Sequence, residues 1–208
     1  MAGLYDETIQ IVTCREDLHS VEDLKGLRVC VGDAGSGAEF NARQILSAYG
    51  LKFSNIQKVN ASFGDSAAAL SAGAIDAAFV VAGAPTKAVS ELAEKNAVHL
   101  IGLDKEHISA LQEQYGFYTE TLVPADTYKG LSGEVDTVSI RATLVANNRL
   151  SEDIVYELLG GLFAEQDALA KGEPKFSGLS LSDAVKGISI PFHTGAARFY
   201  SEQGAEGF

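Results

Sequence analysis

The chain has 208 residues, of which 46% are hydrophobic and 21% charged, and its formal net charge is −12 at pH 7. This composition is typical of a globular protein and is too apolar for a disordered one. The negative charge argues against nucleic acid and anionic membranes as partners, because both attract clusters of Lys and Arg. It does not exclude an anionic ligand, which a few backbone N–H groups can bind inside an acidic protein.

Two cysteines and the lack of a long apolar run limit what else the chain can be. Cys14 and Cys30 form no Cys-x-x-Cys pair and have no zinc-like His spacing nearby, so two isolated apolar thiols and no metal site are predicted. A disulfide between them stays open at this stage. No run of about 20 apolar residues is present, and residues 1–7 lack the basic and apolar regions of a signal peptide. We therefore expect either a cytoplasmic protein or one whose export segment has been removed.

The first half of the chain alternates β-rich apolar runs with amphipathic segments. Strands are predicted at residues 4–13, 28–31, 57–61, 75–81 and 98–103, and helices at about 38–49, 65–72, 85–95 and 107–115. Ser36 and Glu39 have the spacing of a capping box, and Pro85 is predicted at the first position of its helix. Strands and helices that alternate in this way predict a parallel sheet covered on both faces.

The second half has a different character. Residues 117–121 and 135–146 are β-rich and predict connecting strands, and helices are predicted at about 150–171, 180–186 and 195–203. The first of these helices has Ser151 as its expected N-cap and a wide apolar stripe, formed by Ile154, Val155, Leu158, Leu159, Leu162 and Phe163. A stripe of this width needs a partner surface, which the few strands of this half do not provide. We therefore expect that a portion of a larger domain is missing.

The most suggestive local motif is the glycine-rich run 32–37 between a predicted strand and a predicted helix. A turn of this kind presents free backbone N–H groups at the positive end of the helix dipole. Gly35 and Gly37 let a ligand approach closely, and the Ser36 hydroxyl can add a hydrogen bond, which suits a carboxylate or a phosphate. The run has neither the lysine of a P-loop nor the spacing of a dinucleotide-binding motif. The alternative, that Ser36 only caps its own helix, remains open.

A second loop, residues 81–86, also follows the carboxyl end of a predicted strand. In open α/β sheets, ligands bind beyond the carboxyl ends of strands, near a topological switch point. Both loops can therefore line one crevice, although an ordinary strand-to-helix turn explains residues 81–86 better when they are taken alone.

No catalytic set is predicted. The chain has no Gly-x-Ser-x-Gly motif, and its four histidines are scattered. His99 is expected to be a satisfied core residue, His107 to lie on a solvated helix face, and His193 to cap or brace the last helix. The acidic residues are distributed like solvated faces and form no paired acid and base.

These residues together resemble the TAXI family, the extracytoplasmic solute receptors of tripartite ATP-independent periplasmic (TRAP) transporters. The resemblance covers nearly the whole chain in order. The matching segments are LYDETIQIVT (4–13), SVEDLKGLRVCVGDAGSGAEFNARQIL (20–46), GAIDAAFVVAGAPT (73–86), FYTETLVPADTY (117–128), VDTVSIRATLVA (135–146), EDIVYELLGGLF (152–163) and IPFHTGAARFYSEQG (190–204).

The resemblance implies an α/β fold of the type II periplasmic-binding-protein kind, with two lobes, parallel or mixed sheets, and hinge strands that join them. Residues 1–19 and 137–208 would form an incomplete first lobe with the hinge strands and the C-terminal helices, and residues 20–136 the second α/β lobe. It also implies a ligand site. Gly35, Ser36, Gly37 and Ala38 match the turn at a cleft-facing helix, with Ala38 where the family usually has Thr, and Gly83 and Pro85 match a second cleft loop.

The function implied is a non-enzymatic receptor that captures a small carboxylate, such as glutamate or a related dicarboxylate, between closing lobes. The implied partners are the membrane subunits of a TRAP transporter, the implied location is extracytoplasmic, and no cofactor or metal is expected. The family's signal segment and its N-terminal ligand loop are absent from the sequence, so a homodimer that covers the exposed face is a further expectation. A cytoplasmic ligand-sensing domain and an enzyme on the same scaffold are the alternatives. The first would need a helix-turn-helix, and the second a convergent acid and base or a metal set.

Overall fold

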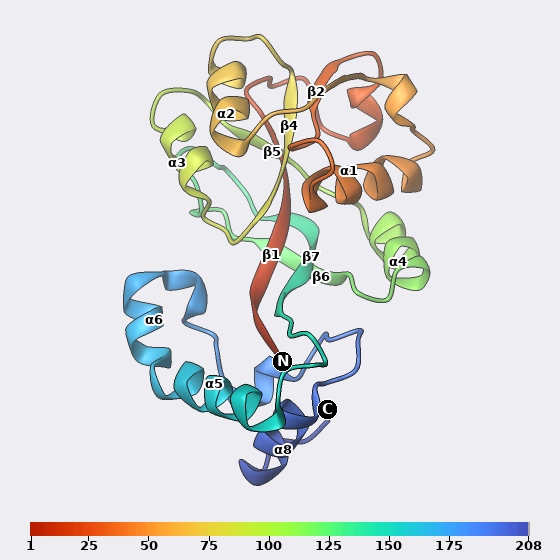
Figure 1. Ribbon diagram of the computed structural model, residues 1–208. Coiled ribbons are helices and arrows are strands. Elements are labelled where there is room, and N and C mark those ends of the chain that lie inside the picture. The colour runs from red at the N-terminus through yellow and green to blue at the C-terminus, as the bar shows by residue number, and fades with distance from the viewer. Residues whose placement is uncertain (208) are drawn as a thin grey trace. The chain divides into compact units, whose positions relative to one another are not determined.

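The computed structural model describes residues 1–207, and within them the chain alternates strands and helices (Figure 1). The strands are β1 Ala2–Thr13, β2 Arg28–Cys30, β3 Gln57–Val59, β4 Ala77–Ala82, β5 His99–Ile101, β6 Thr119–Val123 and β7 Val135–Leu144. The helices are α1 Gly37–Ala48, α2 Phe63–Ser71, α3 Lys87–Ala93, α4 Lys105–Gln114, α5 Glu152–Ala164, α6 Gln166–Gly172, α7 Leu181–Ala184 and α8 Thr194–Glu202. Short 3₁₀ turns lie at Val21–Leu24, Phe53–Asn55 and Pro174–Phe176. The predicted α/β class is confirmed.

The chain divides into two compact units. The larger unit is Thr8–Ser139, and the smaller unit combines Met1–Glu7 with Ile140–Phe208. Strands β1 and β7 run through both. Residues Thr8–Thr13 of β1 pair with β4 and β5 and belong to the larger unit.

The sheet is mixed rather than purely parallel. Its strand order over residues 1–207 is β3-β2-β4-β1-β7-β6, with β5 also paired to β1. β2 is parallel to both β3 and β4, whereas β1 is antiparallel to β4 and β5, and β6 is antiparallel to β7. Parallel neighbours need a crossover connection, usually a helix. Between β1 and β2 the described helical element is the 3₁₀ turn Val21–Leu24, and β1 runs antiparallel to the parallel group formed by β2, β3 and β4.

Helices cover both faces of the sheet in the larger unit (Figure 1). α2 and α3 pack on one face, in a core that includes Leu70, Val89 and Leu92. On the other face lie α1, which buries Ala42, Ile45 and Leu46 as its periodicity predicts, and α4. Strand β4 is buried along nearly its whole length, as expected of a central strand with helices on both sides.

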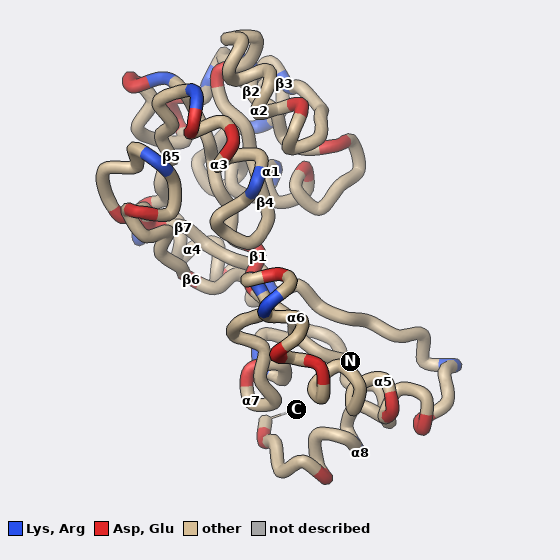
Figure 2. The backbone as a smooth tube through the Cα atoms, turned by 90° about the vertical axis from the view of Figure 1, so that its left-hand side faces the viewer, with Lys and Arg blue, Asp and Glu red and all other residues tan. Residues whose placement is uncertain are grey.

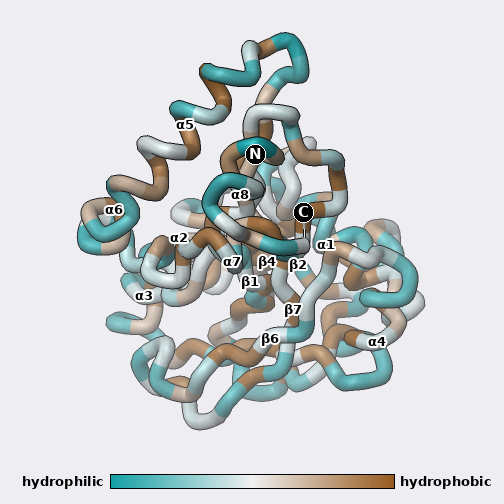
Figure 3. Tube along the Cα trace, turned by 90° about the horizontal axis from the view of Figure 1, so that it is seen from below, coloured by the Kyte–Doolittle hydropathy of each residue, from teal (hydrophilic) through white to brown (hydrophobic). Residues whose placement is uncertain are grey.

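The smaller unit is mainly helical. The predicted helix at 150–171 is divided at Glu165, whose φ of −101° and ψ of 12° end α5 before α6 begins. Ser151 caps α5 as predicted, and its side chain accepts a hydrogen bond from the N–H of Ile154. The apolar stripe of α5 is only half covered. Val155 and Leu159 are buried against α8 and its neighbours, whereas Ile154 and Leu158 are 48% and 53% exposed. Figure 3 shows the hydrophobic positions that recur along α5.

Candidate functional site

The two predicted loops follow neighbouring parallel strands. β2 and β4 are paired with Val29 opposite Ala77 and Cys30 opposite Ala78, so both strands end at the same edge of the sheet. After β2 the chain passes through α1 to β3 on the outer side, and after β4 it passes into α3 on the opposite face. This is a topological switch point, the place where open α/β sheets bind ligands. The topology therefore brings the loops after β2 and β4 to one edge.

The loop after β2 is shaped by its glycines. Gly32 has a φ of +88°, and a Cβ there would lie 2.6 Å from the Cβ of Ala38. Gly35 has a φ of +77° and is exposed. Ser36 is the N-cap of α1, since its hydroxyl accepts a hydrogen bond from the N–H of Glu39 at 3.2 Å. The capping function of Ser36 is confirmed, and a ligand contact for it stays a prediction.

The side chain of Glu39 closes part of this loop from within, which the sequence analysis did not foresee. One carboxylate oxygen accepts the Gly35 N–H at 2.8 Å, and the other accepts Lys58 Nζ at 2.7 Å and Asn60 Nδ2 at 3.3 Å. The Lys58 ammonium and the Gly35 N–H lower the pKa of Glu39 to about 2, so the carboxylate is ionised at neutral pH. The Gly35 N–H is therefore occupied by the protein itself. The capping-box spacing from Ser36 was the sequence signal for a carboxylate at this position.

Two backbone donors remain at the start of α1. The N–H groups of Gly37 and Ala38 have no acceptor among residues 1–207, as expected in the first turn of a helix. Gly37 is exposed. Ala38 is 7% exposed and its methyl group packs against Gly32, so only its backbone can meet a ligand. Of the predicted residues in this loop, Gly37 and Ala38 are those whose N–H groups remain available.

A third loop, which the sequence analysis did not include, lies beside the first. Asn60 follows β3 and donates to the carbonyl oxygen of Gly32 at 2.8 Å, which ties the two loops together. Ser62 then caps α2 and accepts the N–H of Asp65 at 3.2 Å. The spacing of Ser62 and Asp65 was the signal that could have identified this helix start.

The loop after β4 differs from its prediction at Pro85. The helix begins two residues later than expected, at Lys87, with Thr86 in the extended conformation of an N-cap. Pro85 therefore precedes the cap and is not the first helical residue. Its peptide bond to Ala84 is cis. Pro85 is exposed and Gly83 half-buried at this edge.

A buried hydrogen-bonded ring fixes Thr86. Its N–H donates to the hydroxyl of Tyr128 at 2.8 Å, and that hydroxyl donates to the side-chain oxygen of Gln10. The Gln10 amide nitrogen donates back to the Thr86 hydroxyl at 3.0 Å, which itself donates to the carbonyl oxygen of Gly83 at 3.0 Å. Gln10 is 1% and Tyr128 3% exposed, and burial raises the pKa of Tyr128.

Charge is nearly balanced at this edge. The loops and first turns concerned contain three acidic residues, Asp33, Glu39 and Asp65, and two basic residues, Lys58 and Lys87. Figure 2 shows that the acidic residues are spread over the chain rather than gathered in one place. An anion would therefore be bound by backbone N–H groups and not by a cationic patch.

The histidines and cysteines form no catalytic or metal-binding group in the part of the chain that the structure describes. His193 caps α8 as predicted, because its Nδ1 accepts the Gly195 N–H at 3.1 Å. The prediction that His107 lies on a solvated helix face is wrong. This residue is half-buried, its ring stacks on Tyr49 at 3.6 Å between centroids, and its Nδ1 lies 2.7 Å from Asp104 Oδ2.

Two smaller predictions have mixed outcomes. His99 was expected to be a satisfied core residue, but its buried Nε2 has no hydrogen-bond partner among residues 1–207. Cys14 and Cys30 are free thiols, with Cys30 buried, as the prediction of two isolated apolar cysteines requires.

Within residues 1–207, none of the helices has the length and apolar character needed to cross a bilayer.

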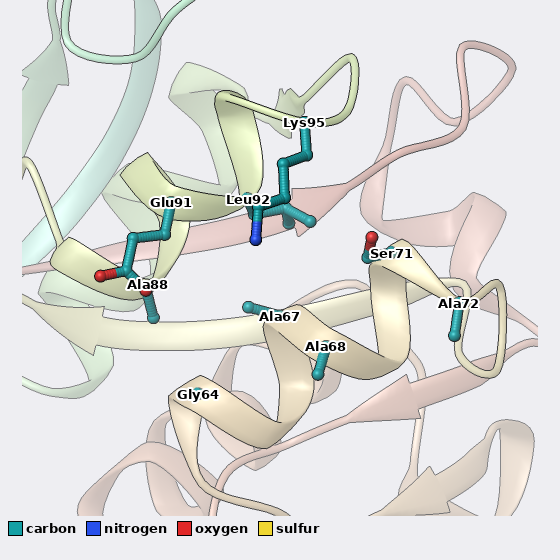
Figure 4. A pocket seen from close by; sticks show the side chains of 9 residues that line it. All are labelled: Gly64, Ala67, Ala68, Ser71, Ala72, Ala88, Glu91, Leu92 and Lys95. Atoms are coloured by element: carbon teal, nitrogen blue, oxygen red, sulfur yellow. The ribbon is translucent and has the colours of Figure 1, made fainter.

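A groove of about 410 Å³ lies elsewhere, between α2 and α3 (Figure 4). Small side chains dominate its lining, which is Gly64, Ala67, Ala68, Ser71, Ala72, Ala88, Glu91, Leu92 and Lys95. The groove runs along the two helices over one face of the sheet, whereas the predicted loops lie at its carboxyl edge. We assign the candidate site to the edge, because the unpaired N–H groups of α1 are found there.

Several solved structures are similar to this chain at low identity. The periplasmic aliphatic sulphonate binding protein SsuA from Escherichia coli is 17% identical with a TM-score of 0.49, over 95% of this chain and 55% of that protein. The alkanesulfonate-binding protein SsuA from Xanthomonas axonopodis pv. citri is 18% identical with a TM-score of 0.49, over 97% and 58%. An amino acid ABC transporter substrate-binding protein from Streptococcus pneumoniae, bound to L-arginine, is 15% identical with a TM-score of 0.42, over 83% and 58%.

The chain thus spans less than two thirds of the length of these proteins. Likenesses at such identities and TM-scores transfer neither a ligand nor a partner to it. The family comparison is more direct, because its match covers residues 1–204. The chain belongs to the NMT1-like family.

Proposed function

We propose that this chain is the solute-binding component of a TRAP-type transporter, a receptor of the TAXI kind, and that it captures a small carboxylate without chemical conversion. Its partners in this proposal are the membrane subunits of the transporter, and its location is extracytoplasmic. The resemblance of the ordered segments between residues 4 and 204 to TAXI receptors, together with membership of the NMT1-like family, supports the proposal.

The observation that carries the proposal is the pair of unpaired N–H groups at Gly37 and Ala38. They lie in the first turn of a twelve-residue helix, at the switch point of the sheet. Such donors stabilise a negatively charged group through hydrogen bonds and through the helix dipole. The loop after β4, with Gly83 and Pro85, would shape the other side of the same edge.

A carboxylate is the anion that best fits the nearly balanced charge. Two adjacent N–H groups match the two oxygens of one carboxylate, and Lys58, which contacts the glycine loop through Glu39, already pairs with that side chain at 2.7 Å. A more highly charged group would find no free cation in these contacts. The proposed ligands are glutamate or a related dicarboxylate, with one carboxylate at the start of α1.

The test is calorimetric titration of the 208-residue chain with glutamate, 2-oxoglutarate and succinate. Succinamide, which has the size of succinate but no charge, is the matched control ligand, and ethanesulfonate tests a different acidic group. We expect saturable binding of at least one carboxylate and none of succinamide. Binding of ethanesulfonate alone would contradict the carboxylate assignment and leave solute capture standing. If none of the acids bound, the proposed function would be wrong.

A further inference from the structure

Tyr128 lies far along the chain from the candidate site and yet contacts one of its loops. It comes from the connection between β6 and β7, and its ring is part of the core between the sheet, α2 and α3. Its hydroxyl reaches Thr86, the N-cap of α3, and Gln10 on β1. Three segments that are distant in sequence therefore meet at one hydroxyl group.

The hydrogen bonds at this point run in one direction around a ring. The Thr86 N–H donates to Tyr128, Tyr128 donates to Gln10, and Gln10 donates to the Thr86 hydroxyl. The same Gln10 nitrogen also donates to the carbonyl oxygen of Ala82 at 3.2 Å. Each member is thus both donor and acceptor, and the ring determines the orientation of the Gln10 amide. A buried network in which every member is satisfied rigidifies its surroundings.

The ring acts on the polypeptide that leaves β4. Ala82 and Gly83 accept hydrogen bonds from Gln10 and Thr86 through their carbonyl oxygens, and Thr86 is bound through both its N–H and its hydroxyl. Apart from Gln10, these contacts all involve the residues that form the second side of the candidate site. Because the loop already has one conformation before a ligand binds, less conformational entropy is lost on binding.

We propose that Tyr128 is a positioning residue for the proposed ligand site, and that it holds the loop after β4 in the shape that receives the solute. The inference rests on the proposed function, because the loop lines a solute site only if the chain binds a solute there. Tyr128 does not touch the ligand. It acts through Thr86, whose N–H it accepts, and through Gln10, which it orients.

The experiment compares Tyr128→Phe with Tyr49→Phe. Tyr49 is a matched control because it lies in the same unit, is 9% exposed, and also binds a helix N-cap through its hydroxyl. That hydroxyl donates to Asp104 Oδ2 at 2.9 Å and accepts the Asp104 N–H at 3.1 Å. Both changes delete one buried hydroxyl. Amide hydrogen exchange at Thr86 is measured first, since it needs no ligand, and the titration with carboxylates follows on the same proteins.

We expect Tyr128→Phe to speed exchange of the Thr86 N–H about tenfold, because the Thr86 N–H loses its hydrogen-bond acceptor, while Tyr49→Phe leaves it unchanged. We also expect the dissociation constant of the carboxylate that binds the wild type to rise about tenfold in Tyr128→Phe alone, because the competent loop is populated less. If Tyr128→Phe does not fold, Thr86→Val is the second variant. It removes the Thr86 hydroxyl, and with it the hydrogen bonds to Gln10 and Gly83, from a half-buried residue. We expect the same weakening of ligand binding.

Unchanged exchange at Thr86 in Tyr128→Phe, or unchanged affinity despite faster exchange, would overturn the inference while the proposed function stands. An equal loss of affinity in Tyr49→Phe would show that the loss follows from lower overall stability, and it would also overturn the inference. A wild type that binds no carboxylate is a different failure, because it removes the proposed function itself and can be recognised without either variant.

Discussion

Replacing Gly37 with proline removes one proposed ligand donor with little disturbance of the fold. Proline is favoured at the first position of a helix, which Gly37 occupies in α1. Ser36 before it has a φ of −77° and a ψ of 163°, the extended conformation that a residue before proline prefers. A Cβ at Gly37 would meet no heavy atom of the described residues within 4 Å. We therefore expect the variant to fold and to gain about 0.4–1 kcal/mol in free energy of unfolding, through the less flexible unfolded chain.

The effect on ligand binding should be in the opposite direction. A hydrogen bond to a charged group is worth about 1.5–3 kcal/mol, which corresponds to a dissociation constant raised roughly 10- to 150-fold. The control is Gly37→Ala, which adds a side chain at the same open position but keeps the N–H. Calorimetric titration of both variants with the carboxylate that binds the wild type compares them directly, and urea denaturation monitors the fold. Equal affinity of a folded Gly37→Pro and of Gly37→Ala would show that this N–H does not contact the ligand.

Three further changes test other parts of the molecule. Asp76→Asn should lower the free energy of unfolding by about 2 kcal/mol at pH 7, because hydrogen bonds from Arg28 lower the pKa of Asp76 from 3.8 to about 2. In urea denaturation this difference from wild type should persist down to pH 4 and shrink only as pH falls from 3.8 through 2. Gly195→Ala should destabilise the smaller unit by at least about 1–3 kcal/mol in thermal denaturation, since its Cβ would lie 2.2 Å from the carbonyl oxygen of Glu152. Glu39→Gln should tighten carboxylate binding in calorimetric titration, and most strongly at low salt, because a like charge is removed beside the loop.

Local signals in the sequence predicted much of the fold. The caps at Ser36, Ser151 and His193 were found because a cap depends on residues two or three positions away in sequence. The alternation of strands and helices gave the α/β class for the same reason. The prediction of Pro85 as the first helical residue was wrong. The preference of proline for a helix start does not distinguish the first helical residue from the residue before an N-cap.

Features that depend on contacts between residues distant in sequence could not be predicted from local signals. The antiparallel pairing of β1 with β4 joins residues about seventy positions apart, and nothing in β1 itself specifies the direction of its partner. The ring of Gln10, Thr86 and Tyr128 spans 118 positions between its ends. The stacking of His107 on Tyr49 likewise depends on the packing of α4 against α1, and so a residue expected to be solvated is half-buried. The partners of such groups are set by the fold rather than by their neighbours in sequence.

The carboxylate of Glu39 also bears on the choice between the two kinds of ligand that the glycine-rich loop suggested. From the sequence, the loop suited a carboxylate or a phosphate equally. In the structure, Glu39 is ionised, it uses the Gly35 N–H, and it pairs with Lys58. A phosphate carries up to two negative charges and would lie beside this carboxylate with only the Gly37 and Ala38 N–H groups left to stabilise it. Like charges that are close together disfavour the more highly charged ligand, whereas two N–H groups satisfy a single carboxylate. We therefore favour the carboxylate, on the ground of the protein's own anion rather than of the loop pattern.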